Sequence, residues 1–263
     1  NKGLDKDDVD TVAFRQECRK FAEGWVGVQR EEFKRLGVQG TWDDPYLTMN
    51  FHAEAVIAEE FQKFLMNGSL YQGSKPVMWS PVEKTALAEA EVEYHDHTSH
   101  QVWVPFTIVA GASARLEGAK VVIWTTTPWT IPQNRAVCFG PTIPYGVYEV
   151  TGRPENSNPT IGARYLMADA LAEGVFAAAK LDTSTMVRRL SDVSADEHGA
   201  LNLAHPFRGV EDSAGEWDYD VPMLPGDHVT EEAGTGFVHT APSHGDDDYQ
   251  IGVKFNLPMT YNV

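Results

Sequence analysis

The feature that most constrains the fold is a series of short apolar runs that Gly and Pro residues interrupt. The runs occupy residues 102–109, 121–124, 136–139, 146–150 and 236–240. Runs of this length between turn-forming residues are typical of β-strands. We therefore expect a twisted or barrel-like sheet. Pro105 marks an edge of that sheet, because proline has no N–H to donate to a strand ladder.

A further strand is expected at residues 88–94, where apolar and acidic residues alternate strictly. Alternation with a period of two places one set of side chains on a packed face and the other in water. The packed face would carry Ala88, Ala90, Val92 and Tyr94.

Helical periodicity dominates the N-terminal part of the chain. Residues 7–36 carry apolar side chains three and four positions apart, followed by Gly37 as a stop. A second helix is expected over 52–66, closing at Asn67-Gly68, a pair suited to a left-handed cap. Shorter helical patterns occupy 168–180 and 246–255. The apolar stripe of the first helix includes Phe14, Phe21 and Trp25, and we expect this exposed face either to fold back onto the barrel-like sheet or to self-associate.

These patterns together predict an α+β fold. Residues 1–74 form a helical connecting segment, and residues 75–263 form a β-rich domain with a barrel-like sheet and surrounding helices. With 263 residues and 42% apolar content, the chain can bury a sizeable core.

Charge and composition narrow the classes of function. The chain has 38 Asp and Glu and 21 Lys and Arg, which gives a formal charge of −17. This charge disfavours extensive binding of a nucleic-acid phosphate backbone. Nucleic acid would have to bind through a small local patch. No apolar run approaches the ~20 residues of a membrane span, and the first residues do not resemble a signal peptide. Cys18 and Cys138 lack the spacing of a zinc site or a disulfide framework, which favours the reducing cytoplasm.

One segment concentrates uncharged hydroxyl groups behind a strand. Residues 121–135 read VVIWTTTPWTIPQNR, and we call them the threonine-rich segment. Pro128 and Pro132 should hold it as a stiff loop, with Thr127 and Ile131 extended. The hydroxyl groups suit a ligand with hydroxyls, an ester or a phosphate. The four that carry them are Thr125, Thr126, Thr127 and Thr130, with Asn134 and Arg135 close by. Alternatively, the β-branched threonines merely complete the strand.

A second constellation, residues 234–249, reads GTGFVHTAPSHGDDDY, and we call it the GTG motif. Its glycines permit a close backbone approach, a short strand presents His239, and a helix then begins with three aspartates, Asp246 to Asp248. These acids suit either a ligand or the positive end of the helix dipole. A metal site formed by His239, His244 and a carboxylate of this motif, with His95, His97 or His100 as a further ligand, is a third interpretation.

The two segments together resemble the paired signatures of the editing domain of isoleucyl-tRNA synthetases. Residues 29–38, 75–80 and 85–94 also resemble that family, so the resemblance covers nearly the whole chain. The related valine and leucine enzymes carry an arginine within the threonine-rich segment and an acid after its proline. This chain has Thr127-Pro128-Trp129-Thr130, as in the isoleucine enzymes.

The resemblance implies hydrolysis of valine misattached to tRNA(Ile). Isoleucyl enzymes are the standard example of double-sieve editing, because a pocket that accepts isoleucine rejects valine only by one missing methylene. The His-Ile-Gly-His and Lys-Met-Ser-Lys-Ser types of motif are not found in the sequence, so we expect no amino-acid activation and no cofactor here. ATP and Mg would belong to the catalytic domain of the parent enzyme. Ser80 stands where some relatives have a zinc-binding cysteine, so we expect no structural metal.

The resemblance also implies partners and a place of action. We expect a cytoplasmic monomer that binds the acceptor end of tRNA(Ile) carrying valine, together with the rest of the synthetase, and no membrane. A non-catalytic module that binds the aminoacylated end, and a metal-dependent hydrolase, are the two alternatives.

The matching motifs imply a role for each residue. Asp248 would hold the α-amino group of the valine moiety. His239 would line the side-chain pocket and exclude isoleucine, with Trp124 and Thr130 as further walls. The catalytic hydroxyls of Thr125, Thr126 and Thr127 would position the terminal adenosine, the ester and an attacking water. Asn134 would support the loop.

Overall fold

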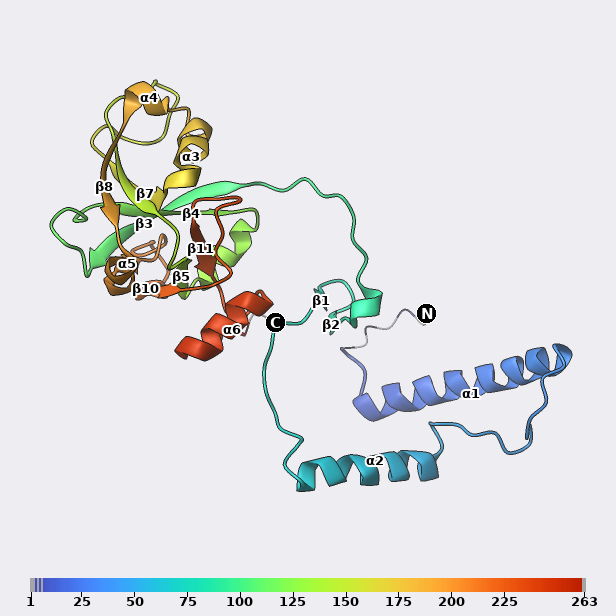
Figure 1. Cartoon of the computed structure of the whole chain (residues 1–263). Coiled ribbons are helices and arrows are strands. Elements are labelled where there is room, and N and C mark those ends of the chain that lie inside the picture. The colour runs from blue at the N-terminus through green and yellow to red at the C-terminus, as the bar shows by residue number, and fades with distance from the viewer. Residues whose placement is uncertain (1–2, 4, 6, 262–263) are drawn as a thin grey trace. The chain divides into compact units, whose positions relative to one another are not determined.

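The computed structural model describes residues 3, 5 and 7–261. Contacts divide the chain into two compact units, Asn1–Gly73 and Ser74–Val263, which we call the helical unit and the sheet unit (Figure 1). In the described part of the chain, no helix is both long and apolar enough to cross a membrane.

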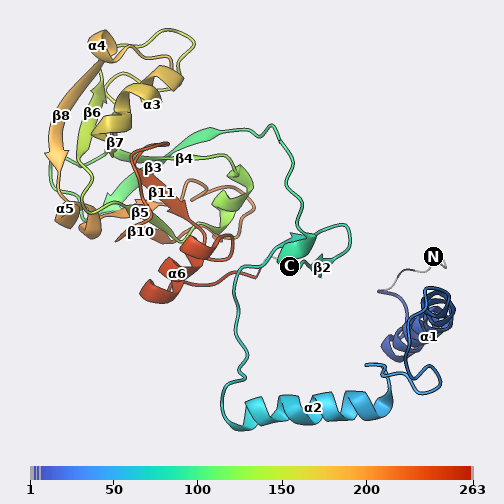
Figure 2. The same cartoon turned by 45° about the vertical axis from the view of Figure 1, so that its right-hand side comes forward.

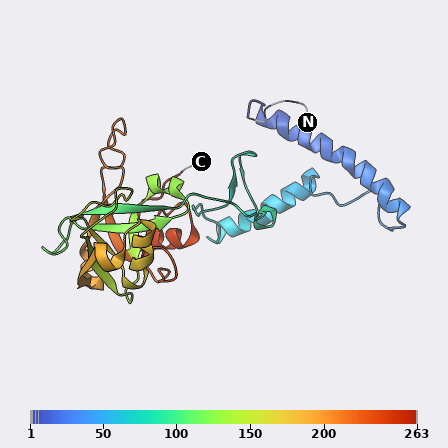
Figure 3. The same ribbon diagram turned by 90° about the horizontal axis from the view of Figure 1, so that it is seen from above.

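The helical unit consists of α1 (Thr11–Arg35) and α2 (Phe51–Met66), so both expected N-terminal helices are confirmed (Figures 1 and 3). Gly37 and Gly68 adopt φ values of 79° and 80° directly after them, a conformation that glycine reaches without steric cost. Arg19 joins the two helices through a 2.5 Å ion pair with Glu54 and a stacking contact over Phe51. No residue of either helix is buried, so the apolar stripe of α1 is exposed within this unit.

The sheet unit is built on a nine-stranded mixed sheet with the strand order β11-β5-β10-β9-β3-β4-β7-β6-β8. Figure 2 shows β8 and β6 at one end of this sheet and α6 near the other end, below β11. The strands are β3 (Val102–Ala110), β4 (Lys120–Thr125), β5 (Ala136–Phe139), β6 (Tyr145–Val150), β7 (Arg164–Ala168), β8 (Val187–Val193), β9 (Asn202–Ala204), β10 (Asp220–Pro225) and β11 (Phe237–Thr240). A separate hairpin pairs β1 (Trp79–Ser80) with β2 (Thr85–Ala86).

Short helices connect these strands. They are η1 (Glu89–Glu91), η2 (Pro128–Gln133), η3 (Asp169–Leu171), α3 (Ala172–Ala178), α4 (Thr183–Met186), α5 (Ala195–Ala200) and α6 (Asp246–Phe255). The expected helix at 246–255 is confirmed. The one expected over 168–180 begins later, because β7 uses Ala168 as its last residue and a 3₁₀ turn follows.

The sheet curls as a barrel does. Strand β11 pairs with β5 and also packs against β4, although several strands separate β11 from β4 in the sheet order. The apolar interior between them includes Phe106, Val121, Ile123 and Phe237, all 3% exposed or less. The expected α+β class is confirmed, and the curl places the end of β4 beside β11.

The expectation that Pro105 marks an edge of the sheet is wrong, because β3 lies between β9 and β4 in the sheet order. Strand β3 pairs with β4 from Val102 to Thr107, and Pro105 stands opposite Val122. On the other side of β3, strand β9 pairs only at Ile108 and Ala110. The N–H that proline lacks is therefore not needed at this position.

Two further expectations about local structure are wrong. Residues 88–94 form no strand, because the side chain of Glu91 turns back to accept a hydrogen bond from the Ala88 N–H at 2.7 Å, which closes the 3₁₀ turn η1. Tyr94 is 85% exposed instead of packed. Residues 128–133 form the 3₁₀ helix η2 instead of an extended loop, so Ile131 is helical although a proline follows it.

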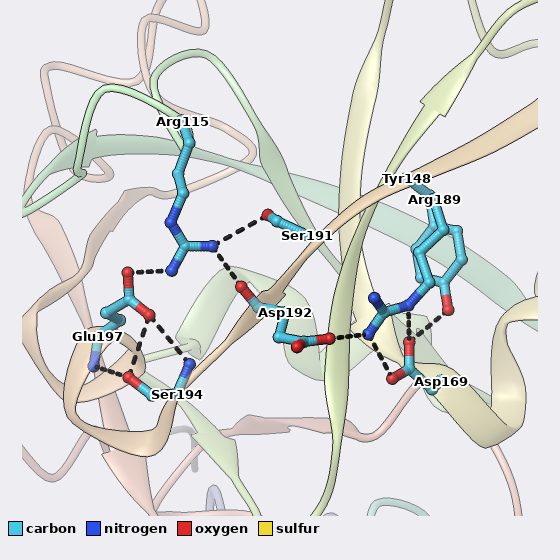
Figure 4. Close-up of polar contacts among 8 residues, drawn as sticks. All are labelled: Arg115, Tyr148, Asp169, Arg189, Ser191, Asp192, Ser194 and Glu197. Atoms are coloured by element: carbon cyan, nitrogen blue, oxygen red, sulfur yellow. Dashed lines mark hydrogen bonds and ion pairs between the residues drawn. The ribbon is translucent and has the colours of Figure 1, made fainter.

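A polar network ties β8 to the turn that leads into α3 (Figure 4). The guanidinium group of Arg189 donates to both carboxylate oxygens of Asp169 at 2.9 and 2.7 Å, and Tyr148 donates to the same carboxylate. Hydrogen bonds from Arg189 hold the pKa of the Asp169 carboxyl below its usual range. Because Asp169 opens η3, this network fixes where α3 starts above the sheet.

Candidate functional site

The threonine-rich segment leaves the sheet at the end of β4. The Oγ1 atom of Thr125 accepts a hydrogen bond from the Thr127 N–H at 3.1 Å, so the backbone turns as soon as the strand ends. Pro128 then occupies the first turn of η2, where its missing N–H would have no partner in any case. The result is a rigid turn that presents Thr130 and Asn134 toward the interior, where both are buried.

The GTG motif lies directly beside this turn. Its strand, β11, pairs antiparallel with β5, and the Arg135 N–H donates to the Thr240 carbonyl at 2.9 Å. A Cβ atom on Gly234 would lie 3.3 Å from the Trp124 ring, and one on Gly236 would lie 2.3 Å from Ala168. Both glycines have φ near +80°, so this close approach suits glycine alone.

His239 joins the two segments. Its Nδ1 atom lies 2.7 Å from the side-chain nitrogen of Asn134, and its Nε2 atom lies 2.8 Å from the Thr130 hydroxyl. The same Asn134 nitrogen donates to the Ala136 carbonyl at 2.8 Å, which fixes the orientation of the amide. Because an amide nitrogen only donates, Nδ1 must accept, and the ring proton resides on Nε2. Thr130 therefore accepts from His239 and donates onward to the Thr127 carbonyl at 2.9 Å.

Burial keeps this imidazole neutral. It lowers the pKa of His239 to about 4, with smaller contributions from His244 and His205. A neutral ring is the form that accepts from Asn134, so burial and hydrogen bonding favour the same protonation state. The side chain is held at both nitrogens and cannot turn without breaking a hydrogen bond.

Asp248 lies in the first turn of α6 and is partly buried. Its Oδ1 atom accepts a hydrogen bond from the Ala241 N–H at 2.9 Å, which folds the carboxylate back toward β11. Burial raises the pKa of this carboxyl above its ordinary value. Among the described residues, no cationic side chain forms an ion pair with it. A positively charged ligand would therefore stabilise its charged form.

Most predicted site residues come together, and some do not. Thr125, Thr127, Thr130, Asn134 and His239 form one connected set of hydrogen bonds. The Thr126 side chain is exposed, and its carbonyl accepts from the Ser99 hydroxyl at 2.7 Å. Asp248 has no direct hydrogen bond to the threonine-rich segment. A contact between His244 and Gln133 links its turn to η2 instead.

Trp124 lines a cleft of about 290 Å³ together with Gln101, Trp103 and Gly234. The indole Nε1 of Trp124 donates to the Gln101 side chain at 3.1 Å. Four contacts of the site were not predicted from the sequence, namely Gln101, Ser99, Gln133 and His244. The first two precede β3 in a polar stretch without periodicity, so no pattern marked them.

The histidines proposed as an alternative metal site do not gather. Within residues 3, 5 and 7–261, no group of three or more His, Cys, Asp or Glu side chains is close enough to hold a metal ion. His95, His97 and His100 are exposed. Both cysteines are free, Cys18 at the surface and Cys138 buried.

The fold and the paired motifs define a class of protein. Residues 1–241 match the model of the class I tRNA synthetases for isoleucine, leucine, methionine and valine, and the chain belongs to this family. Within it, similar proteins include isoleucine–tRNA ligases. That of Ruegeria pomeroyi is 57% identical over 100% of this chain, and that of Bradyrhizobium diazoefficiens is 55% identical over 97%. The resemblance inferred from the motifs is confirmed.

The chain spans 27% and 26% of the length of these two relatives. Among solved structures, the editing domain of the P. knowlesi cytosolic leucyl-tRNA synthetase is similar, with a TM-score of 0.42 and 12% identity. The similarity covers 60% of this chain and 63% of that one.

Proposed function

We propose that this chain hydrolyses the ester bond of valine misattached to tRNA(Ile). The observation that carries the proposal is the His239 side chain, held between Thr130 and Asn134 at 2.8 and 2.7 Å. This contact unites the two sequence motifs that resemble the editing signature. The substrate would be the single-stranded acceptor end, which accords with the strongly acidic composition, because only a short segment of RNA has to enter.

Asp248 would bind the α-amino group of the valine moiety. Its carboxylate is partly buried and forms no ion pair with the described cations, so an ammonium group would relieve the unfavourable burial of its charge. A charge-assisted hydrogen bond of this kind also selects aminoacyl esters over plain RNA ends.

His239 would form the wall that limits the size of the amino acid. A neutral ring, fixed at both nitrogens, cannot move aside for one more methylene. The double-sieve logic requires such a rigid wall, since only a smaller pocket separates valine from isoleucine in the second step.

The threonines would position the ester and the water. The hydroxyls of Thr125 and Thr127 lie 3.2 Å apart and hydrogen-bond one another, so they fix the turn. The Thr126 side chain is exposed, and no described residue hydrogen-bonds its hydroxyl. Thr126 is therefore the hydroxyl best placed to meet substrate or water. Catalysis would consist mainly of holding that water in line with the ester carbonyl.

The direct test measures valine release from valyl-tRNA(Ile) by the chain and by Asp248→Asn, which keeps the shape and the acceptor for Ala241. Loss of a hydrogen bond between charged groups should reduce release by about 10- to 150-fold. Asp246→Asn is the matched control, since Asp246 is an exposed acid in the same helical turn. Equal rates in all three proteins would refute the role of Asp248.

The two alternatives give different results in the same assay. A binding module would retain the aminoacylated end without turnover in any variant. A metal hydrolase would lose its activity to a chelator and regain it when metal is added back.

A further inference from the structure

One long loop of the sheet unit packs against η2, although it is distant from both motifs in the sequence. Residues 205–219 connect β9 to β10, and we call them the aromatic loop. Strand β10 runs parallel to β5, with Met223 opposite Val137. The residues that precede β10 therefore run beside those that precede β5, which are the residues of η2. The sheet topology thus brings the aromatic loop to the short helix that carries Thr130 and ends at Asn134.

Three side chains of the aromatic loop each donate a hydrogen bond to one backbone carbonyl at the end of η2. The pairs are His205 Nε2 to Ile131 at 3.0 Å, Trp217 Nε1 to Pro132 at 2.8 Å and the Tyr219 hydroxyl to Asn134 at 2.6 Å. His205 donates through Nε2 because its Nδ1 accepts from the Phe207 N–H at 3.1 Å. The last carbonyls of a helix have few partners within it, so the aromatic loop supplies the donors that η2 lacks.

The three donor rings also pack against one another. His205 lies nearly parallel to Trp217, at an interplanar angle of 13° with the ring centroids 6.1 Å apart, and its centroid is 5.4 Å from that of Tyr219. The guanidinium group of Arg135 lies over the Tyr219 ring, 4.5 Å from its centroid. A ring that is held by its neighbours as well as by a hydrogen bond has little freedom to turn. The aromatic loop is therefore a rigid support for the end of η2.

Asn134 connects this support to the candidate site. Its carbonyl accepts from Tyr219, while its side-chain nitrogen donates to His239 Nδ1 and to the Ala136 carbonyl. Among the residues that the structure describes, the three ring donors of the aromatic loop form hydrogen bonds with backbone groups only. They consequently act on His239 through the position of the backbone at Asn134.

We propose that Trp217 and Tyr219 are positioning residues of the candidate site. Their hydrogen bonds fix the end of η2 in the conformation in which the Asn134 amide reaches His239, and the held His239 ring then excludes side chains larger than that of valine. The inference rests on the proposed function, because that function assigns the size limit to His239. It extends the determinants of specificity to a loop that shares no residue with either motif.

The first test compares the hydrolysis of valyl-tRNA(Ile) and isoleucyl-tRNA(Ile) by the parent chain, Tyr219→Phe and Trp217→Phe. Each variant removes one hydrogen-bond donor and keeps an aromatic ring in the cluster. Because the end of η2 is then less firmly held, His239 should yield more readily to isoleucine. In each variant the ratio of valine release to isoleucine release should fall by about 2- to 12-fold, the equivalent of one neutral hydrogen bond.

Tyr148→Phe is the matched control. The Tyr148 hydroxyl donates to the Asp169 carboxylate in the network of Figure 4, outside the aromatic loop and η2. The control therefore loses a hydrogen bond from the same kind of donor and should keep the release ratio of the parent chain.

A double-mutant cycle separates positioning from a general loss of stability. In a chain that carries His239→Ala, the further change Tyr219→Phe should leave the release ratio as it is, because no ring remains to be positioned. If Tyr219→Phe changes the ratio equally with and without the histidine, the two residues act independently and the proposal is wrong.

NMR of the free chain tests the same connection without a substrate. The ¹⁵N chemical shifts of the His239 ring distinguish a nitrogen that accepts a hydrogen bond from one that carries the proton. In the parent chain Nδ1 should be the accepting nitrogen. In Tyr219→Phe and Trp217→Phe its shift should move toward that of a ring that exchanges between both tautomers, and in Tyr148→Phe it should stay unchanged.

Two results would overturn the inference. One is a parental release ratio in both Tyr219→Phe and Trp217→Phe, and the other is an equal loss of the ratio in Tyr148→Phe. Failure of the proposed function would look different, since no protein would then release valine, yet the His239 ring shifts would still respond to Tyr219→Phe and not to Tyr148→Phe.

Discussion

The side-chain amide of Asn134 donates to the Nδ1 atom of His239 at 2.7 Å and to the Ala136 carbonyl at 2.8 Å. Asn134 is completely buried. It thus connects the end of η2, the first residue of β5 and the histidine of β11. One amide consequently sets the tautomer and the direction of the ring that faces the threonine-rich segment.

Replacing that amide by a carboxylate should change the protonation of the histidine. In Asn134→Asp, an acceptor faces Nδ1, and a nearby negative charge favours the imidazolium form. We expect the pKa of His239 to rise from its present value of about 4, as measured by NMR titration of the ring protons. Asn158→Asp makes the same change at an exposed position and should leave this pKa where it is. A pKa of His239 that does not rise in Asn134→Asp would disprove the assigned contact.

Two buried histidines should respond to the same substitution in opposite ways. Both ring nitrogens of His198 lack a partner among the described residues, and the ring packs among Phe139, Tyr145 and Phe237. His198→Leu removes these unsatisfied groups and should raise the free energy of unfolding by about 1–3 kcal/mol. His205 accepts from the Phe207 N–H at 3.1 Å and donates to the Ile131 carbonyl at 3.0 Å.

His205→Leu should therefore lower the free energy of unfolding by at least about 1 kcal/mol, because it leaves one buried and one partly buried backbone group without their partners. Urea denaturation at neutral pH measures both variants. Stabilisation by His205→Leu, or destabilisation by His198→Leu, would contradict the hydrogen bonds assigned to these rings.

The lowered pKa of His198 should make the stability of the chain depend on pH. Burial lowers the pKa of His198 to about 4 in the folded chain, against an ordinary value of 6.5. Between these values the unfolded chain binds the proton and the folded chain does not, so stability falls as the pH drops from 6.5 toward 4. His198→Leu should reduce this loss, measured as thermal stability across that range. An identical pH profile in the variant would show that His198 does not titrate as described.

Alanine substitutions at two glycines allow the cost of backbone strain to be measured apart from the cost of a steric clash. Gly236 and Gly162 have φ values of 80° and 84°. A Cβ atom at Gly236 would lie 2.3 Å from Ala168, whereas one at Gly162 would meet nothing within 4 Å. In both alanine variants the free energy of unfolding should fall by about 1–2 kcal/mol, because alanine is strained in the left-handed backbone conformation. Gly236→Ala should lose a further 1–3 kcal/mol, roughly, from overpacking. Similar unfolding free energies for the two variants would disprove the close approach at Gly236.

Local patterns predicted the elements that carry the motifs. The runs at 136–139 and 246–255 coincide with β5 and α6 because their apolar spacing and turn residues agree with the tertiary structure. The strand expected at 88–94 does not form. Alternation identifies a possible packing face, but it does not show that another part of the chain covers that face. Instead, the Glu91 carboxylate accepts a hydrogen bond from the Ala88 N–H within the same turn.

Pairings between distant segments could not be read from the chain in the same way. Strands β7, β8, β9 and β10 were missed, since polar residues interrupt β8 and β9 is short. The roles of Asp248 and His239 came from the family resemblance, whereas the hydrogen bonds that join His239 to Thr130 and Asn134 required the fold.

The most direct test of the account is a side-by-side measurement of ester hydrolysis on valyl-tRNA(Ile) and isoleucyl-tRNA(Ile). The parent chain should release valine much faster than isoleucine, and His239→Ala should release isoleucine at a rate that approaches its rate for valine. If the parent chain releases both amino acids at the same rate, the histidine wall does not set the size of the pocket and the account is contradicted.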